Sequence, residues 1–288
     1  MEAEQHMRRA ADPAASHPNF EKGPPNRAHR VSFTIAISWI GRFLVLRDRV
    51  MGWVESGRRP EGSLEKVSRL TIASDASNLE AVFVEPVPGP APAAILLCHG
   101  IGETVEQWLG VQQLLAANGV ASLVFDYSGY GRSTGRPDWD RFEKDAMAAF
   151  AVLKRLAPES KRAVLGFSLG SGVAAATINR LSAHQLILCE AFTSFRAAAT
   201  ARWIPKSLTH LVPPIWHARE PLANCRLPVL IVHGERDKVF PVAMATELAG
   251  YCSPQAEIVI VPDTAHNQPF RRPRLDYWGP IIEWLGRS

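Results

Sequence analysis

The feature that most constrains this chain is the pentapeptide Gly166-Phe167-Ser168-Leu169-Gly170, a G-x-S-x-G frame between two apolar runs. Ala163–Leu165 before it has the character of a short buried strand, and Ser171–Ile178 after it is small and apolar, as in a helix packed on a sheet. A sharp turn between a strand and a helix exposes the serine hydroxyl, and the glycines leave room for that turn and for close packing. The segment predicts a candidate nucleophile at Ser168, against the alternative of an inert turn serine.

From about residue 64 onward, strand-like and helix-like segments alternate along the chain. The expected strands are Lys66–Ile72, Leu79–Glu85, Ala93–Cys98, Val120–Asp126, Ala163–Leu165, Gln185–Glu190, Val229–His233 and Ala256–Val261. Beyond the helix after Ser168, the expected helices are Val105–Asn118, Phe142–Leu156, 242–250 and Leu275–Leu285. The first two strands are expected to pair through the turn residues Ser74–Asn78. Such alternation predicts an α/β fold, with a mostly parallel eight-stranded sheet covered by helices on both faces.

The N-terminal region differs from the rest. Residues 1–30 are rich in proline and mixed charges and are predicted to be a disordered tail. Residues 31–63 are expected to hold an amphipathic helix, with a roughly helical apolar stripe over 33–54, and a linker. The uncharged run Val31–Gly41 is too short for a membrane span of about 20 residues. The stripe predicts either packing on the domain or a partner, or peripheral membrane contact through 31–54. Residues 64–288 are predicted to form the main domain.

Composition excludes several classes of function. The formal net charge of the 288 residues is only +4 and basic residues form no long run, so no nucleic-acid partner is expected. The cysteines at 98, 189, 225 and 252 are far apart, without the spacing of a zinc site, so no metal is predicted. Cys98 and Cys189 lie in strand-like runs, which favours buried free thiols and a cytoplasmic protein, with membrane association as an alternative.

A serine hydroxyl becomes an effective nucleophile when a histidine accepts its proton and a carboxylate orients that histidine. Asp237 follows the predicted strand 229–233 and His266 follows the last predicted strand, so both lie at the carboxyl ends of strands, where such sheets present their ligand-facing loops. We therefore expect Ser168, Asp237 and His266 to act together. The histidines that fit less well are His6, His17 and His29 in the tail, His184 before a strand, and His99 and His233 as loop braces.

A second acidic residue competes with Asp237. Glu190 ends the preceding predicted strand and is the alternative partner of the histidine. Asp263 is too close to His266 in sequence to orient its ring easily. Asp126 and Arg132 are expected to brace a loop rather than to act in chemistry.

Over residues 66–288 the chain resembles the α/β-hydrolase family of serine hydrolases. The resemblance rests on the Ser–Asp–His order, on Cys98-His99-Gly100-Ile101-Gly102 after the third predicted strand, and on Asp126-Tyr127-Ser128-Gly129-Tyr130-Gly131-Arg132-Ser133 after the fourth. It implies an oxyanion hole made by the backbone N–H groups of Leu169 and Ile101, and chemistry without a metal or organic cofactor. The loops are similar to those of monoacylglycerol lipase-like, thioesterase-like and prolyl-aminopeptidase-like members.

The resemblance also implies a short helical cap, at about 192–227, and a small acyl-containing substrate. The cap region is rich in aromatic residues, and either Trp203 or Trp216 lines an acyl pocket or both pack the cap onto the body. The expected reaction is hydrolysis of an ester or thioester, or of a small amide. A haloperoxidase-like side reaction without a cofactor stays open, and an aspartate-nucleophile chemistry is disfavoured because Ser168 stands at the nucleophile position. The alternatives are a non-catalytic binding protein and a membrane-recruited lipase or protein-deacylating thioesterase. The sequence does not indicate an oligomeric state.

Overall fold

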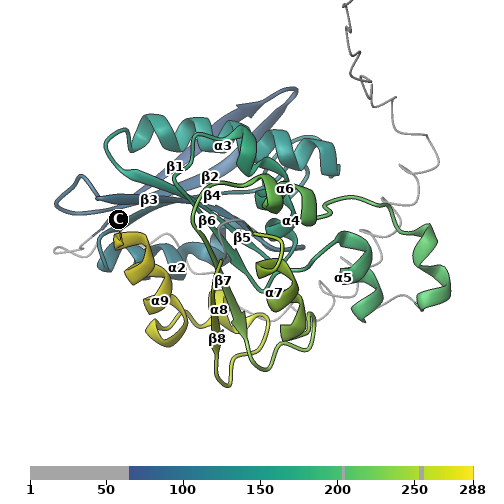
Figure 1. The fold of residues 1–288 in the computed structure, drawn as a ribbon. Coiled ribbons are helices and arrows are strands. Elements are labelled where there is room, and N and C mark those ends of the chain that lie inside the picture. The colour runs from purple at the N-terminus through teal and green to yellow at the C-terminus, as the bar shows by residue number, and fades with distance from the viewer. Residues whose placement is uncertain (1–64, 203–204, 253–255, 288) are drawn as a thin grey trace, which may run out of the picture.

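A single twisted sheet of eight strands organises the computed structural model, which describes residues 65–202, 205–252 and 256–287. The strands lie in the order β1-β2-β4-β3-β5-β6-β7-β8. Their bounds are β1 Glu65–Ser74, β2 Ser77–Pro86, β3 Ala93–Cys98, β4 Val120–Phe125, β5 Lys161–Phe167, β6 Gln185–Cys189, β7 Val229–Gly234 and β8 Glu257–Val261. The pairs from β4 to β8 are parallel, and β1 and β2 are antiparallel to their neighbours. The predicted α/β fold is confirmed (Figure 1).

The β1–β2 hairpin has a tighter turn than the five-residue one that the sequence predicts. Ser74 pairs with Ser77, so only Asp75 and Ala76 connect the strands. Asp75 has a φ of 45°, a conformation that aspartate tolerates better than most residues and that two-residue hairpin turns require. The predicted turn Ser74–Asn78 was too long because the polar residues Ser77 and Asn78 belong to the strand.

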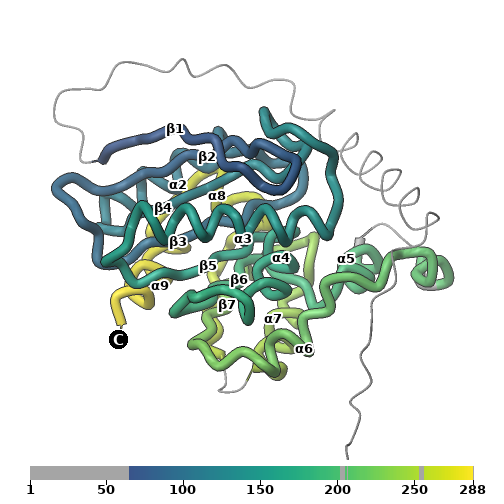
Figure 2. The backbone as a smooth tube through the Cα atoms, turned by 90° about the horizontal axis from the view of Figure 1, so that it is seen from above, coloured from purple at the N-terminus to yellow at the C-terminus, as the bar shows by residue number. Residues whose placement is uncertain are grey.

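Helices cover both faces of the sheet (Figures 1 and 2). The helices are α2 Val105–Ala117, α3 Trp139–Leu156, α4 Leu169–Thr177, α5 Phe195–Arg202, α6 Arg219–Asn224, α7 Val242–Ala249, α8 Gln268–Arg271 and α9 Leu275–Gly286, with short 3₁₀ turns η1 Ile178–Arg180 and η2 Lys206–Leu211. One core contains residues of α3, α4, α6 and α7, and the other contains residues of α2, α8 and α9. Every residue of β3, β4, β6 and β7 is buried, as in a parallel sheet covered on both faces.

The segment between β6 and β7 holds α5, η2 and α6. Both views place α5 at the edge of the domain, on the side away from α9 (Figures 1 and 2). The predicted tail, the predicted amphipathic helix and the linker, over residues 1–63, lie outside the described residues. Among the residues that are described, no helix has both the length and the apolar character needed to cross a bilayer.

Candidate active site

Ser168 lies on a sharp turn between β5 and α4. Its backbone has φ 52° and ψ −117°, a strained conformation for a residue with a side chain. A Cβ atom at Gly166 would lie 2.4 Å from the carbonyl oxygen of Gly170, and one at Gly170 would lie 1.9 Å from that of Cys98. Only glycine therefore fits at either end of this turn. The packing presses the first turn of α4 against the end of β3 and fixes the position of Ser168.

The loops after β7 and β8 carry Asp237 and His266, and they are joined by backbone contacts. The N–H of Arg236 donates to the carbonyl of Thr264 over 2.9 Å. A Cβ atom at Gly234 would approach that same carbonyl to 2.4 Å, so the loops pass each other at a distance that only glycine allows. Since β7 and β8 are parallel neighbours, both loops leave the same edge of the sheet.

A continuous chain of hydrogen bonds joins the three predicted residues. Nδ1 of His266 lies 2.7 Å from Oδ2 of Asp237, and Nε2 of His266 lies 2.9 Å from Oγ of Ser168. Because a carboxylate can only accept, Nδ1 carries the proton and Nε2 is free to accept from the serine. Phe167 and Phe240 pack against the His266 ring at centroid distances of 5.6 and 5.2 Å. All three polar side chains are buried, so the chain of bonds is shielded from water.

Asp237 is held from behind by its own loop. Its Oδ1 accepts the backbone N–H groups of Val239 over 2.6 Å and Phe240 over 2.9 Å. Burial alone would raise the pKa of Asp237, but hydrogen bonds from His233 and His266 hold it well below its usual range. The carboxylate is therefore an anion with a fixed orientation.

Glu190, the alternative acid, lies beside Asp237 and not on His266. With His233 it forms a buried group whose ligand-type atoms lie within 4.8 Å of one another. Three such atoms are a common start for a metal site, but here both oxygens of Asp237 already accept hydrogen bonds. Nε2 of His233 faces the carbonyl oxygen of Phe240 at 3.0 Å, so it bears a hydrogen rather than a free lone pair. This donor set suits a proton network better than a cation.

The two predicted oxyanion donors lie on facing segments. Leu169 is the first residue of α4, where a backbone N–H has no acceptor within its own helix. Ile101 lies in the loop after β3, next to Gly102 with φ 72°. This loop approaches the start of α4 closely, since a Cβ at Gly170 would also lie 2.8 Å from the carbonyl oxygen of His99. The two backbone groups thus belong to segments in direct contact.

Sequence reasoning missed Glu103, which closes the same loop. Its Oε2 accepts the N–H of Gly100 over 2.8 Å and the indole N–H of Trp108 over 2.9 Å. The side chain is buried, and burial raises its pKa despite these two donors. A carboxyl directly after a glycine-rich loop and before a helix was the available signal.

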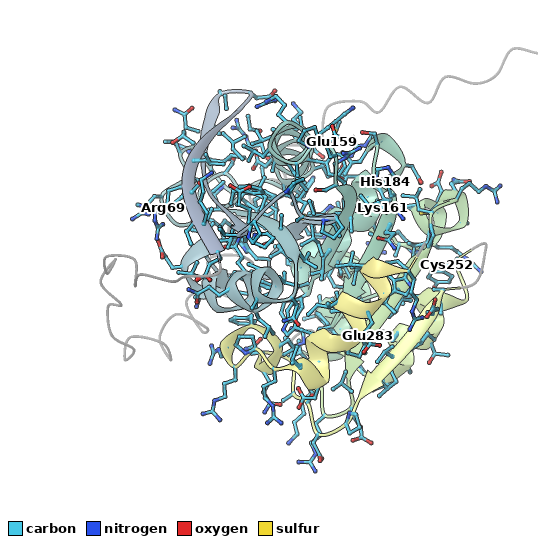
Figure 3. All side chains as sticks on the ribbon, turned by 90° about the vertical axis from the view of Figure 1, so that its left-hand side faces the viewer. Arg69, Glu159, Lys161, His184, Cys252 and Glu283 are labelled. Atoms are coloured by element: carbon cyan, nitrogen blue, oxygen red, sulfur yellow. The ribbon has the colours of Figure 1, made fainter. Side chains whose placement is uncertain are left out.

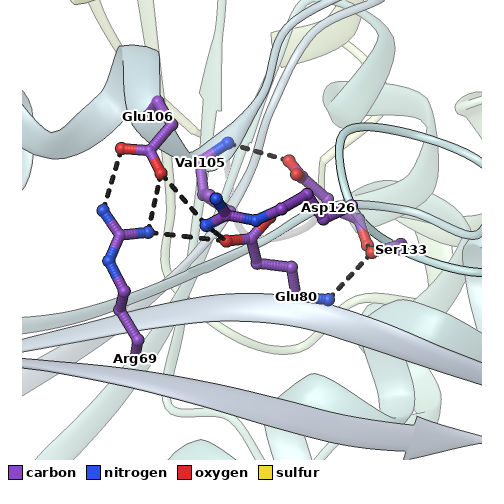
Figure 4. Close-up of polar contacts among 7 residues, drawn as sticks. Arg69, Glu80, Val105, Glu106, Asp126 and Ser133 are labelled. Atoms are coloured by element: carbon purple, nitrogen blue, oxygen red, sulfur yellow. Dashed lines mark hydrogen bonds and ion pairs between the residues drawn. The ribbon is translucent and has the colours of Figure 1, made fainter.

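Asp126 has the bracing position that its sequence context predicts. Its Oδ1 accepts the first N–H of α2, from Val105, over 2.8 Å, and its carbonyl accepts from the Ser133 hydroxyl over 2.7 Å (Figure 4). Ser133 Oγ accepts in turn from the N–H of Glu80 over 2.9 Å, which ties the loop to β2. On the surface next to it, ion pairs connect Arg69 and Arg132 with Glu80 and Glu106.

Of the two tryptophans proposed for an acyl pocket, Trp203 lies outside the described residues and Trp216 is buried. The Trp216 ring packs against Phe142 and Phe195 at centroid distances of 6.2 and 5.8 Å, and its Cβ would be 3.0 Å from a Cβ at Gly172 of α4. Its indole nitrogen has no hydrogen-bond partner among the described residues. Its two sequence neighbours, Ile215 and His217, line a hollow of about 630 Å³.

This hollow lies under the cap segment and has a mostly apolar wall. Its lining includes Arg196, Ala197, Thr200, Thr209, Ile215 and Met244. It is open to the surface, and Ser168 and His266 are not among its lining residues. Met244 lies in α7, which begins five residues after Asp237, so one wall of the hollow comes from the segment that follows the Asp237 loop.

Comparisons with known proteins identify similar sequences and the same fold. Residues 89–224, just under half of the chain, match the family model described as serine aminopeptidase, S33. An uncharacterised Mycobacterium tuberculosis protein is 28% identical over 199 residues, which covers 68% of this chain and 70% of that protein. Lysophosphatidylserine lipase ABHD12 of Xenopus tropicalis is 28% identical over 200 residues, covering 62% of this chain and about half, 52%, of the lipase. An esterase of Pyrococcus furiosus superposes with a TM-score of 0.64 at 20% identity, covering 82% of this chain and 96% of the esterase.

The order of the strands, the serine on the sharp turn after β5 and the similar structures together define this protein as one with the α/β-hydrolase fold. The chain has this fold, and its similarity to a serine aminopeptidase family model, to a lipase and to esterases indicates a hydrolase.

Proposed function

We propose that this hydrolase cleaves carboxylic esters through a covalent acyl intermediate on Ser168. The observation that carries the proposal is the position of His266, which bridges Ser168 and Asp237 with contacts of 2.9 and 2.7 Å. A histidine between a hydroxyl and a buried anion can accept the hydroxyl proton while its own positive charge is stabilised. The strained turn at Ser168 supports the same role, since strain of this kind persists where it positions a reactive group.

In the first half-reaction, Oγ of Ser168 bonds to the acyl carbon as its proton passes to Nε2 of His266. The carbonyl electron pair moves onto the oxygen, which accepts the N–H groups of Leu169 and Ile101. When this intermediate collapses, the bond to the alkoxy group breaks and the departing alcohol takes the proton from His266. In the second half-reaction, water gives a proton to His266 and adds to the acyl carbon. The bond between that carbon and Oγ of Ser168 then breaks, the acid leaves, and Oγ takes the proton back from His266. Asp237 stays ionised throughout and stabilises the imidazolium.

The substrate class follows from the relatives and from the hollow under the cap. Relatives and structural neighbours include esterases and a lysophosphatidylserine lipase, all of which are named for ester cleavage. We propose a small acyl ester whose apolar portion extends toward the hollow beside Trp216, where a mostly apolar wall favours a hydrocarbon chain. The family model is named for an aminopeptidase, so amides belong in the test.

The test combines active-site labelling with a substrate panel. A fluorophosphonate probe should label the wild-type protein and Ser182→Ala, an exposed serine used as a matched control, but not Ser168→Ala. A panel of p-nitrophenyl esters of increasing chain length, acyl thioesters and aminoacyl amides then identifies the scissile bond. The proposal fails if folded Ser168→Ala keeps full esterase activity, or if the probe does not react with the wild-type protein.

A further inference from the structure

Glu190 places a second carboxyl group against Asp237, and the register of the sheet puts it there. Cys189 of β6 pairs with Val232 of β7, so the next residues, Glu190 and His233, lie side by side. Glu190 has a φ of 46°, which turns its side chain into the protein, where its exposed fraction is 0%. Its Oε1 accepts the N–H of Gly234 over 2.9 Å.

The other oxygen of Glu190 faces the site. Oε2 has no hydrogen-bond partner among the described residues and lies 3.8 Å from Nε2 of His233. The same His233 nitrogen lies 3.3 Å from Oδ2 of Asp237. A buried carboxylate oxygen without a donor is costly, whereas a protonated oxygen at this position can donate to the nearby Asp237.

The groups around Glu190 and Asp237 can stabilise only one negative charge on the two carboxyl groups. His233 Nε2 donates to the Phe240 carbonyl, and its Nδ1 has no acceptor among the described residues, so the ring is neutral. The nearest ring nitrogens are Nδ1 of His266, 2.7 Å from Asp237, and Nε2 of His233, 3.3 Å from Asp237, and Glu190 has neither within hydrogen-bond distance. Two buried carboxyl groups that share one basic partner cannot both ionise. Asp237 accepts two backbone N–H groups in addition to His266, while Glu190 accepts one, so Asp237 keeps the charge.

We propose that Glu190 is a positioning residue that acts as a neutral carboxylic acid, holding a proton against Asp237 and so keeping Asp237 the sole anion behind His266. This role rests on the proposed function of Ser168, His266 and Asp237. It differs from the role of an alternative triad acid, because a neutral Glu190 never carries the charge that stabilises the imidazolium.

The surroundings of Glu190 support the neutral form. Burial first, and then the adjacent Asp237, raise the pKa of Glu190 to about 10. The other titratable groups that face it are the Cys189 thiol and the Tyr277 hydroxyl from α9, whose pKa values burial also raises. The Tyr277 hydroxyl and the Gly234 N–H act in the opposite direction and lower the pKa of Glu190, but burial and Asp237 outweigh them. None of these groups supplies a positive charge. Nδ1 of His266, the closest ring nitrogen to the cluster, bonds to Asp237 and not to Glu190.

The first experiment measures protonation through stability. A carboxyl that is neutral when folded but ionises when unfolded makes folding less favourable as pH rises from its unfolded pKa of 4.5 toward about 10. Glu190→Gln removes this effect. The difference in melting temperature between Glu190→Gln and the wild type should therefore increase, in favour of the variant, by about 3 °C per pH unit between pH 6 and 9. Glu190→Met should show the same slope whatever its starting stability, which covers the case that the amide variant folds poorly.

A matched control is Glu159→Gln, at the surface where Figure 3 labels Glu159. Its melting temperature should follow that of the wild type with a constant difference from pH 6 to 9. If the Glu190 variants also keep a constant difference, Glu190 is ionised in the folded protein and the proposal is wrong.

The second experiment measures the positioning role with an ester substrate. The amide of Glu190→Gln can still accept from Gly234 and donate to Asp237, so kcat/KM should stay within about threefold of wild type, with the acidic limb of its pH profile unmoved. Glu190→Met loses both bonds, and kcat should fall about tenfold at similar KM. A hundredfold loss in Glu190→Gln, or a shift of its acidic limb to lower pH, would mean that His266 depends on a negative charge at Glu190.

The two proposals fail separately. If the wild-type protein does not react with the fluorophosphonate, the proposed function is wrong while the melting slopes still report the protonation of Glu190. If labelling is normal and the slopes are flat, only the role of Glu190 is overturned.

Discussion

Asp237 holds His266 through one carboxylate oxygen, with a 2.7 Å contact to Nδ1, while its other oxygen is occupied by two backbone N–H groups. Because the backbone fixes the carboxylate, its second oxygen stays directed at Nδ1 of His266, and the ring is held in the tautomer that accepts from Ser168.

Replacing Asp237 by Asn should remove the control of the His266 tautomer with little change in the shape of the side chain. The amide can donate to Nδ1, which favours the tautomer with its proton on Nε2, where it cannot accept from Ser168. We expect kcat to fall on the order of 10⁴-fold, with a smaller effect on KM. Steady-state kinetics with a p-nitrophenyl ester measures this.

The matched control for that change is Asp263→Asn. Asp263 lies three residues before His266, is exposed, and pairs with Arg236 on the surface. Its loss should leave kcat within about twofold, since exposed ion pairs contribute little. Equal losses in Asp237→Asn and Asp263→Asn would show that the His266 loop responds to any charge change and that Asp237 has no special role.

The turn at Ser168 should not tolerate a methyl group at Gly170. A Cβ there would lie 1.9 Å from a backbone carbonyl of β3, which cannot move without disturbing the centre of the sheet. We expect Gly170→Ala to cost more than about 3 kcal/mol of unfolding free energy, or to prevent folding. Expression yield and chemical denaturation test this.

Gly110→Ala is the contrasting substitution. Gly110 is exposed on α2, and a Cβ there would have its nearest contact at 3.4 Å, with the Pro273 ring. Alanine should stabilise the helix by about 0.5–1 kcal/mol. If both alanine variants have wild-type stability, the close packing at the start of α4 does not constrain the fold.

Much of the site could be predicted because parallel strands end at one edge of the sheet. Once Ser168, Asp237 and His266 were each placed behind a buried strand, their proximity followed from the fold. The pairing of Glu190 with Asp237 could not be predicted in the same way, since it depends on which residue of β6 faces which residue of β7. A shift of one residue in that register would have pointed Glu190 elsewhere.

The helices that the sequence did not reveal are the short ones. α6 and α8 contain six and four residues, too few to show a helical period, and their formation depends on packing against the domain. For Trp216 the sequence left two roles open, lining an acyl pocket or packing the cap onto the body, and could not decide between them. Its buried contacts with Phe142 and Phe195 arise only when the cap segment folds back over α4.

Filling the hollow under the cap should change the preference for chain length. Ala197 lines it from α5 and is half-buried, so a phenyl ring at this position would occupy part of the space. For Ala197→Phe we expect KM for long-chain p-nitrophenyl esters to rise about tenfold, whereas the acetate ester, which does not reach the hollow, keeps its kinetics.

Ala151→Phe, on the exposed face of α3, is the matched control and should leave both substrates unaffected. An equal effect of Ala197→Phe on acetate and long-chain esters would mean that the ring perturbs the site generally. No effect on either would mean that the hollow does not receive the acyl chain.

Glu103 should control the loop that carries Ile101. Removing its side chain leaves the Gly100 N–H and the Trp108 indole N–H without their acceptor in a buried region. Each lost partner costs about 1–3 kcal/mol, so Glu103→Ala should lose about 2–4 kcal/mol of unfolding free energy. Because the loop then loosens around Ile101, kcat should fall between about 10- and 100-fold, which is no more than the loss expected when one oxyanion donor is removed.

Glu103→Gln keeps one acceptor oxygen, so its stability and its kcat should lie between those of the wild type and those of Glu103→Ala. Glu106→Ala, which removes an exposed carboxylate from the first turn of the following helix α2, should change stability by less than about 1 kcal/mol and leave kcat unaltered. If Glu103→Ala loses stability but keeps full kcat, Glu103 supports the fold and Ile101 does not depend on it.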